Sequence, residues 1–243
     1  MENHLADYAR DGYCVIPEGL SLDEVGAINA AIDADLRENR RLWRRGNYPG
    51  VRNSLVLLSR PEFDVTMRPP GLVPLMEGIM GADLCADQHE VVIRPPNPES
   101  PSQCEWHRDG TRPMSPPCYT YLLHLVIYLT RVGDDTHCFS VIPGSSQGRE
   151  FPPIEEYDLD SAVHITGEPG TAILCNGAIL HALNFRKTAE ERRTVNCWIG
   201  RSSQPAMANH TIFPRRLCRS EDAETARFYS RANEITHLMR NHF

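Results

Sequence analysis

From Leu84 onward the sequence breaks into short, β-rich segments separated by turns rich in proline and glycine. The breaks read RPPNPESP, MSPP, VGDD, PGSSQG, GEPG and NGA. Short strands between regular turn signals are typical of a β-sandwich or barrel, whereas βαβ units would need helical segments between the strands. We therefore predict a mainly-β core, with strands near residues 84–94, 119–131, 137–142, 161–166, 171–175, 179–185 and 193–200.

Helical segments flank this region on both sides. The Ser21–Glu24 pattern is a capping box, and an apolar stripe follows it at spacings of three and four residues to about Arg40. A second helix is predicted over 72–80, with Gly81 as its stop, and a third over 220–242. We expect all 243 residues to form a single domain, a cupin-like double-stranded β-helix (jelly roll) with N-terminal and C-terminal helices packed outside it.

Composition narrows the classes of function. The formal net charge of −7 argues against nucleic acid or an anionic membrane surface as the main partner. The eight cysteines are scattered singly without a C-x-x-C pair, which disfavours a zinc knuckle or a thioredoxin-type site. The N-terminus lacks the pattern of a secretory signal, and no segment approaches 18 continuous apolar residues. We therefore expect a cytoplasmic protein with reduced thiols.

One of the ten histidines begins a His-x-Asp or His-x-Glu triplet, at His107 and Asp109. In an extended strand, residues i and i+2 point to the same face, so both side chains can reach one ion. His181, which follows a predicted strand and turn, is the best candidate for a third ligand. Two histidines and one carboxylate form the facial triad of non-haem Fe(II) enzymes. Taken alone, the triplet is near what chance supplies, and a lone histidine such as His181 is more often a half-buried structural residue.

Two neighbouring arginines are candidates for a cation beside such a metal site. Arg192 lies eleven residues beyond His181 and opens a predicted strand. A dicarboxylate that chelates iron at one end needs a partner for its far carboxylate, and the planar fork of arginine binds carboxylate with two hydrogen bonds. Arg192 and Arg193 point to opposite faces, so only one can serve, and the polar face of the strand favours Arg192. The alternative for either residue is a surface salt bridge with Glu190 or Glu191.

Five segments follow one another along the chain: YARDGYCVIP from residue 8, WHRDG, FSVIPGSSQG, GTAILCNGAILHALN and ERRTVN. In order and spacing they resemble the phytanoyl-CoA dioxygenase-like family of Fe(II)- and 2-oxoglutarate-dependent oxygenases, over nearly the whole chain. The resemblance implies that His107, Asp109 and His181 are the catalytic iron ligands and that Arg192 anchors 2-oxoglutarate. It also implies dioxygen as a cosubstrate and ascorbate as a candidate stimulant.

The activity implied by this resemblance is hydroxylation of an unactivated C–H bond of a small-molecule substrate, with release of succinate and CO2. Desaturation, epoxidation or ring formation by the same iron chemistry is an alternative. Two further alternatives are a non-catalytic cupin-like binding protein and a metal-assisted hydrolase or isomerase. Halogenation is disfavoured because Asp109 is present. Two positions depart from the family pattern, both outside the metal set: Ser146 replaces a histidine, and Thr136-His137 replaces Asn-Gly.

Other polar residues near these motifs have two explanations each. By the same resemblance Gln88 is a candidate second contact to 2-oxoglutarate, and otherwise an exposed polar residue of a strand. His124 is either a neutral, hydrogen-bonded core histidine or a cosubstrate contact. Four residues flank the inferred mouth of the barrel, where packing or surface exposure explains them more simply than contact with substrate: Trp106, Arg108, Arg112 and Trp198.

Overall fold

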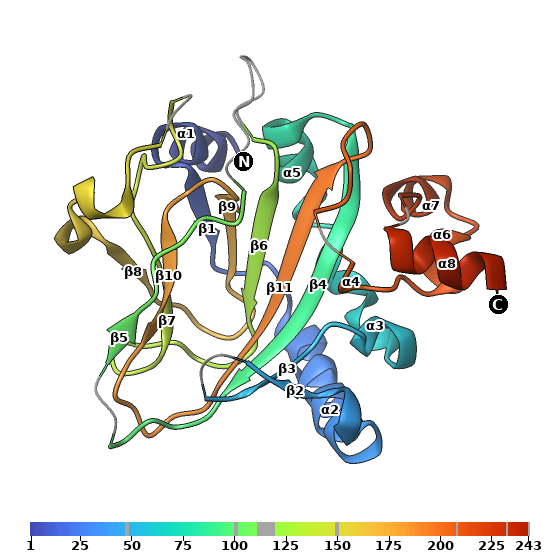
Figure 1. Cartoon of the computed structure of the whole chain (residues 1–243), viewed down its shortest axis with the longest axis horizontal. Helices are drawn as coiled ribbons and strands as arrows, with labels where there is room; N and C mark the ends of the chain where they lie inside the picture. Colours follow the sequence, from blue (N-terminus) through green and yellow to red (C-terminus); the bar gives the residue numbers. More distant parts are fainter. Residues whose placement is uncertain are drawn as a thin grey trace.

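Two antiparallel β-sheets face each other at the centre of the molecule (Figure 1). The computed structural model describes residues 1–46, 49–99, 102–110, 120–148, 151–207, 209–231 and 233–242. The larger sheet has the strand order β1-β9-β6-β11-β4-β3-β2, and the smaller sheet has the order β5-β10-β7-β8. The strands are β1 (Tyr13–Ile16), β2 (Arg44–Arg45), β3 (Val51–Asn53), β4 (Leu84–Arg94), β5 (Gln103–Cys104), β6 (Leu123–Tyr128), β7 (Cys138–Val141), β8 (Val163–Ile165), β9 (Ala172–Asn176), β10 (His181–Phe185) and β11 (Arg192–Arg201). The predicted mainly-β architecture is confirmed.

Each of the seven predicted strands corresponds to a strand of the structure, and β4 has the predicted bounds. The segment predicted over 119–131 shortens to β6, and its first residue, Tyr119, lies outside the described residues. Four strands were not predicted, namely β1, β2, β3 and β5, which have only two to four residues each. They lie at or next to the sheet edges. A segment this short contains too few residues to display an alternating pattern.

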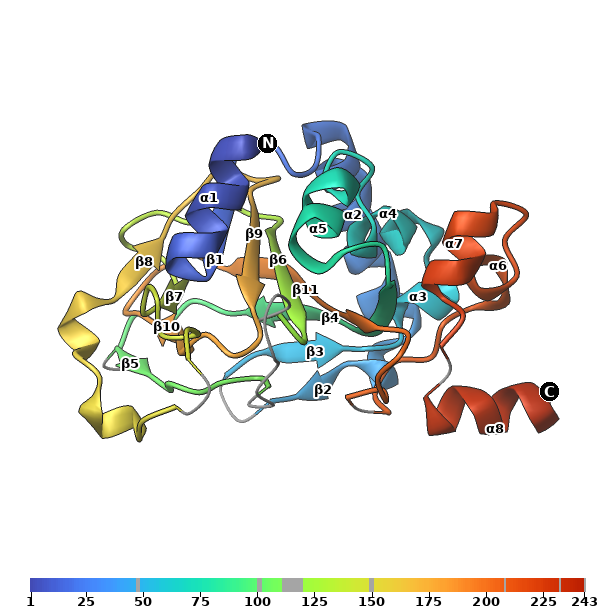
Figure 2. The same ribbon diagram turned by 90° about the horizontal axis from the view of Figure 1, so that it is seen from above.

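The helices lie outside the sheets, as predicted (Figure 2). α2 (Leu22–Glu38) begins at the expected capping box, in which Ser21 and Glu24 cap each other's backbone N–H groups. None of the described helices is long and apolar enough to cross a bilayer. The remaining helices are α1 (Glu2–Asp11), α3 (Val56–Ser59), α4 (Asp64–Met67), α5 (Val73–Met80), α6 (Arg215–Cys218), α7 (Ala223–Phe228), α8 (Glu234–His242) and the 3-10 turns η1 (Arg40–Leu42), η2 (Pro61–Phe63), η3 (Ile154–Glu156) and η4 (Leu159–Ser161).

The prediction of one continuous C-terminal helix over 220–242 is wrong. α7 ends at Phe228, and a new helix, α8, begins at Glu234. The Asn233 side chain accepts a hydrogen bond from the Thr236 backbone N–H at 2.8 Å, which is the arrangement that starts a helix. Tyr229, the residue directly after α7, is buried against Phe213 and Phe228. The first helix therefore ends where this aromatic side chain enters the core.

The two faces of the larger sheet bury different kinds of side chain. Val195, Cys197 and Ile199 of β11 are fully buried in a core that includes residues of α2, α4 and α5. Burying one such apolar side chain stabilises the fold by roughly 1.5–3 kcal/mol. The alternate residues of β11 face the smaller sheet, and near β6 and β7 this space holds a second apolar core with Val126 and Tyr128. Elsewhere the space between the sheets is polar, and the candidate site lies there.

The helix-covered core also contains a neutral histidine. His89 of β4 is fully buried, and its Nε2 lies 2.9 Å from Thr66 Oγ1, while its Nδ1 has no hydrogen-bond partner among the described residues. Burial lowers the pKa of His89 to about 3. The unfolded chain takes up this proton near pH 6.5, whereas the native state does not. The contribution of neutral His89 to the free energy of unfolding is therefore present above about pH 6.5 and is lost as the pH falls toward 3.

We expect the free energy of unfolding to fall by about 1.4 kcal/mol per pH unit below pH 6 because of His89. Urea unfolding of the wild type and of His89→Leu at pH 8 and pH 5 measures this effect. The variant should lose less stability between the two pH values than the wild type does. An equal loss in both proteins would show that His89 does not titrate in this way.

Candidate active site

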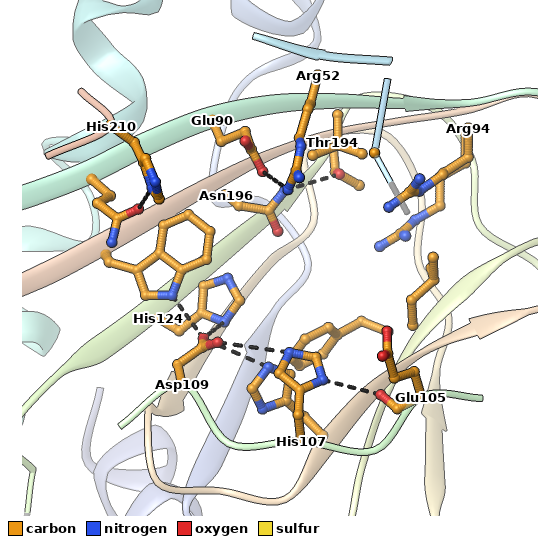
Figure 3. Close-up of a pocket in the computed structure, with 18 of the residues that line it drawn as sticks. Arg52, Glu90, Arg94, Glu105, His107, Asp109, His124, Thr194, Asn196 and His210 are labelled. Carbon is orange, nitrogen blue, oxygen red and sulfur yellow. Dashed lines mark hydrogen bonds and ion pairs between the residues drawn. The ribbon is translucent and has the colours of Figure 1, made fainter. Parts of the chain in front are cut away.

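The three predicted ligand residues converge at one cavity between the sheets (Figure 3). The ligand atoms of His107, Asp109 and His181 all lie within 4.8 Å of one another. Asp109 Oδ1 is 3.7 Å from His107 Nε2, and Asp109 Oδ2 is 3.6 Å from His181 Nε2. The His181 side chain is buried and the His107 side chain is half exposed, so the cluster lies at the cavity mouth.

Backbone hydrogen bonds hold the three residues together. His107 and His181 form an isolated antiparallel bridge, in which each backbone N–H donates to the other's carbonyl at 2.9 and 3.0 Å. The Asp109 N–H donates to the carbonyl of Gly177, in the turn before β10, at 2.9 Å. The prediction placed His107 and Asp109 on one regular strand. Instead, His107 forms this single bridge and Asp109 follows it in a bend.

The two imidazoles present the nitrogen that a metal needs. His107 Nδ1 lies 3.0 Å from the Glu105 carbonyl oxygen, and His181 Nδ1 lies 3.0 Å from the Ile179 carbonyl oxygen. A carbonyl oxygen only accepts, so each Nδ1 carries the hydrogen and each Nε2 keeps its lone pair. Burial lowers the pKa of His181 to about 4, so its ring is neutral near pH 7. Both Nε2 atoms are therefore suited to bind a metal ion.

Asp109 is held from the larger sheet. Its Oδ2 accepts a hydrogen bond from Trp198 Nε1 at 2.7 Å and lies 3.1 Å from His124 Nδ1. Burial raises the pKa of this carboxyl, but the imidazoles of His181 and His124 and the Trp198 N–H outweigh burial, and the pKa lies well below its usual range. The side chain is therefore an ionised carboxylate, which is the kind of third donor that a facial triad needs.

His124 is not the hydrogen-bonded core histidine that one explanation required. Its ring stacks on Trp198, with centroids 4.6 Å apart and an angle of 12° between the planes. Neither ring nitrogen makes a well-directed hydrogen bond to a described residue, although Nδ1 approaches Asp109. The side chain is buried and lines the cavity beside the ligand cluster.

Arg192 is a buried cation without an acidic partner. It lines the cavity with only 5% of its surface exposed, and its guanidinium carbon lies 5.3 Å from the centre of the Tyr128 ring. No aspartate or glutamate of the described residues lies within ion-pair distance of it. Burial lowers the pKa of Arg192, but arginine keeps its proton in proteins. An uncompensated buried charge is costly, so this part of the cavity is suited to bind an anion.

Arg193 points away from the cavity, as the alternation along β11 predicts. It forms salt bridges of 2.8 Å with Asp33 and with Glu191. A surface salt bridge was the alternative explanation for either arginine, and Arg193 is the one that forms it. Arg192 is the one arginine of this pair that faces the ligand cluster.

The cavity has a volume of about 370 Å³ and a largely polar wall on β4 and β11. Gln88 lies in this wall, so the alternative of an exposed strand residue is wrong. Its Oε1 is 3.2 Å from His210 Nδ1, and its backbone is opposite Trp198, whereas Arg94 is opposite Arg192. Gln88 and Arg192 therefore lie toward different ends of the cavity. The contact of Gln88 with 2-oxoglutarate stays a prediction.

The cavity is also lined by polar residues that the sequence analysis did not identify, among them Glu90 and His210. Glu90 follows Gln88 by two positions on β4, so the alternation of side chains along the strand already placed Glu90 on the same face as Gln88. His210 comes from the segment between β11 and α6, and no local pattern in the sequence connects it with Gln88. Both side chains line the cavity, and Figure 3 shows His210 and Glu90 along the same wall.

The other residues noted near the motifs support the loops. The Arg108 guanidinium donates to the carbonyl oxygens of Ser145 and Ala178, so its role is structural; Arg112 lies outside the described residues. His137, at a departure from the family pattern, stacks on Phe185 and accepts from the Arg186 backbone N–H at 3.1 Å. Neither His137 nor the second departure, Ser146, lines the cavity.

Solved structures of known enzymes share this architecture. The non-heme alpha ketoglutarate dependent epimerase SnoN from nogalamycin biosynthesis is 20% identical, with a TM-score of 0.68 over 83% of this chain and 80% of that chain. EctD from S. alaskensis, solved with 2-oxoglutarate and 5-hydroxyectoine, is 19% identical, with a TM-score of 0.68 over 85% and 78%. HygX from Streptomyces hygroscopicus, solved with nickel and 2-oxoglutarate, is 15% identical, with a TM-score of 0.68 over 85% and 89%. At these identities the similarity establishes the fold, and it confirms the predicted jelly roll with flanking helices.

Sequence comparison identifies the family. A search among curated protein sequences found no match. The sequence profile described as phytanoyl-CoA dioxygenase (PhyH) matches residues 8–194, which is most of the chain. The matched range includes the three clustered residues and Arg192. The chain therefore belongs to the phytanoyl-CoA dioxygenase (PhyH) family.

Proposed function

We propose that this chain is an Fe(II)- and 2-oxoglutarate-dependent oxygenase that hydroxylates an unactivated C–H bond of a small molecule. One observation carries the proposal: two imidazole Nε2 atoms and a carboxylate converge in a cavity that also contains a buried arginine without an acidic partner. A binding protein needs no metal cluster with open positions beside an anion site. The combination suits a cosubstrate that binds a metal at one end and carries a carboxylate at the other.

His107, Asp109 and His181 would hold the iron. Their donor set is that of non-haem Fe(II) oxygenases, and the carbonyl oxygens bonded to both Nδ1 atoms fix the tautomers that such binding needs. When bound, Fe(II) together with 2-oxoglutarate and dioxygen supplies the oxidising chemistry, with succinate and CO2 as coproducts. The protein's own contribution is to fix the donors and to shape the cavity around them.

Arg192 would bind the far carboxylate of 2-oxoglutarate. Its charge is buried, so the attraction to a carboxylate is screened less than at the surface. Phe139 and Leu183 line the same cavity, and the Phe139 ring lies 5.2 Å from that of His181. These apolar side chains would exclude water from the space between the arginine and the ligand cluster.

The substrate would bind at the Trp198 end of the cavity, where Gln88, Glu90 and His210 form a polar wall. A long hydrocarbon would displace water from Glu90 and His210, which are only partly buried or exposed, without offering hydrogen bonds in return, which is unfavourable. We therefore infer a small, polar substrate with hydrogen-bonding groups. The inferred role of Gln88 then shifts from the cosubstrate toward the substrate.

The function is tested by succinate release from 2-oxoglutarate in the presence of Fe(II) and ascorbate. The wild type should show slow turnover without substrate, because the cosubstrate and iron sites are formed by the protein alone. His107→Ala and Asp109→Ala should reduce release to the background of the metal-free protein. His4→Ala, a substitution on α1 outside the cavity, should leave release unchanged.

The metal spectrum and the product mass complete the test. If the wild type binds Fe(II) but 2-oxoglutarate does not perturb the spectrum of the metal, the oxygenase proposal is wrong. With a substrate in hand, hydroxylation adds one oxygen atom to the product. Desaturation or ring formation removes two hydrogen atoms, and epimerisation leaves the mass unchanged. The epimerase SnoN and the non-heme alpha ketoglutarate dependent carbocyclase SnoK from nogalamycin biosynthesis (21% identical, TM-score 0.67) both have folds similar to this chain, so the fold alone does not choose between these outcomes.

A further inference from the structure

Trp198 connects the larger sheet to the ligand cluster. Its indole N–H donates to Asp109 Oδ2 at 2.7 Å, and His124, stacked on the indole, lies 3.1 Å from the same oxygen (Figure 3). Asp109 Oδ1 makes no hydrogen bond to a described side chain and faces His107 Nε2 at 3.7 Å. The two oxygens of this carboxylate therefore have different surroundings.

Each of the three clustered side chains has its own orienting partner. The imidazoles of His107 and His181 are oriented by backbone carbonyl oxygens two residues before them. Asp109 lies in a bend, outside any strand, so strand pairing does not fix its carboxylate. The Trp198 N–H is the donor that does so.

Trp198 is well placed for this task because its own position is fixed. It lies in the middle of β11, paired with Gln88 of β4 on one side and His124 of β6 on the other. The stacked His124 ring restricts rotation of the indole. The indole nitrogen can only donate, so it can pair with a carboxylate but not compete for a metal ion.

We propose that Trp198 is a positioning residue for Asp109: its N–H, bonded to Oδ2, fixes the carboxylate so that it faces the same point as the two imidazole Nε2 atoms. The inference rests on the proposed metal site. If Trp198 has this role, the Asp109 carboxylate is oriented before a metal ion binds, which makes metal binding tighter. Loss of such an outer partner typically weakens metal binding by about 10- to 100-fold.

The test uses Trp198→Phe, which keeps an aromatic ring over His124 and removes the N–H donor. The dissociation constant for Mn(II), measured by titration without substrate or turnover, should rise by about 10- to 100-fold. The chain offers a matched control in Trp43→Phe. Trp43 Nε1 also donates to a buried carboxylate, Asp35 Oδ2, at 2.9 Å, but it does not line the cavity. This control should lower the melting temperature and leave the Mn(II) dissociation constant unchanged.

The outcomes separate this inference from the proposed function. If the wild type and Trp198→Phe bind Mn(II) equally well, the positioning role is wrong and the metal site stands. If the wild type binds no Mn(II), the proposed function fails, and the inference fails with it.

A second measurement needs no variant at position 198. In wild-type protein labelled with 15N at the indole nitrogens, one indole signal should shift on addition of Zn(II) and stay protected from solvent exchange. Trp43→Phe and Trp106→Phe assign that signal to Trp198 by elimination. An indole that exchanges freely with solvent in the Zn(II)-bound protein overturns the proposal, even if Trp198→Phe does not fold.

Discussion

Replacing Arg192 with methionine is expected to weaken 2-oxoglutarate binding by about 100- to 1000-fold and to raise the thermal stability of the protein at the same time. The proposed carboxylate contact would be buried and charge-assisted, and its loss would correspond to about 3–4 kcal/mol. In the protein without 2-oxoglutarate, however, the same guanidinium is buried without an acidic partner. Methionine has a similar length and no charge to desolvate, so the apoprotein should become more stable.

Titration of the Fe(II) protein with 2-oxoglutarate measures the first effect, and thermal unfolding without cosubstrate measures the second. Arg193→Met is the matched control, because Arg193 makes surface salt bridges to Asp33 and Glu191. It should change both quantities little, since exposed salt bridges contribute about 0–1 kcal/mol. If Arg192→Met lowers the melting temperature and leaves 2-oxoglutarate binding intact, Arg192 is a structural residue and the assignment of the anion site is wrong.

The parts of the site that the sequence predicted are those with local patterns. The His-x-Asp triplet brings two donors to one side whether the backbone forms a regular strand or the single bridge and bend that the structure shows. The choice between Arg192 and Arg193 followed from alternation along β11, whose pairing with β4 runs without a register shift from Arg192 to Trp198. In both cases the relevant side chains are at most a few residues apart, so no knowledge of the tertiary structure was needed.

The parts that were missed depend on contacts across the fold. Trp198 and Asp109 are 89 positions apart, and the hydrogen bond between them joins the larger sheet to a loop. His210 meets Gln88 across 122 positions. Nothing near either residue in the sequence indicates its partner, so the orientation of the carboxylate and the polar end of the cavity appear only in the structure. The break between α7 and α8 is a similar case, because the burial of Tyr229 decides it.

A buried carboxylate in α2, remote from the site, should have the largest effect on stability: Asp35→Ala is expected to destabilise the fold by about 3–5 kcal/mol. Asp35 is fully buried on the apolar face of the helix, where the predicted stripe contained only hydrophobic residues. Burial raises the pKa of Asp35, but its hydrogen bonds together lower the pKa by more than burial raises it. The pKa therefore lies below the usual value, and the carboxyl group is ionised. Its donors are Asn39 Nδ2 at 2.6 Å, Trp43 Nε1 at 2.9 Å, Asn53 Nδ2 at 3.1 Å, Ser59 Oγ at 2.9 Å and Arg60 Nε at 3.4 Å.

Removing Asp35 leaves these donors, including a positive charge, without their common acceptor, which is why the expected loss exceeds that of a single hydrogen bond. Urea unfolding at pH 7 measures the loss, and Asp33→Ala is the control, because half of the Asp33 side chain is exposed. The control should cost about 0–1 kcal/mol. Because the folded pKa of Asp35 is depressed, its contribution is present above about pH 4 and is lost as the pH falls through the folded value. The difference between wild type and Asp35→Ala should therefore shrink in acid. A difference that is small at pH 7, or independent of pH, would mean that the five donors find other acceptors when the carboxylate is absent.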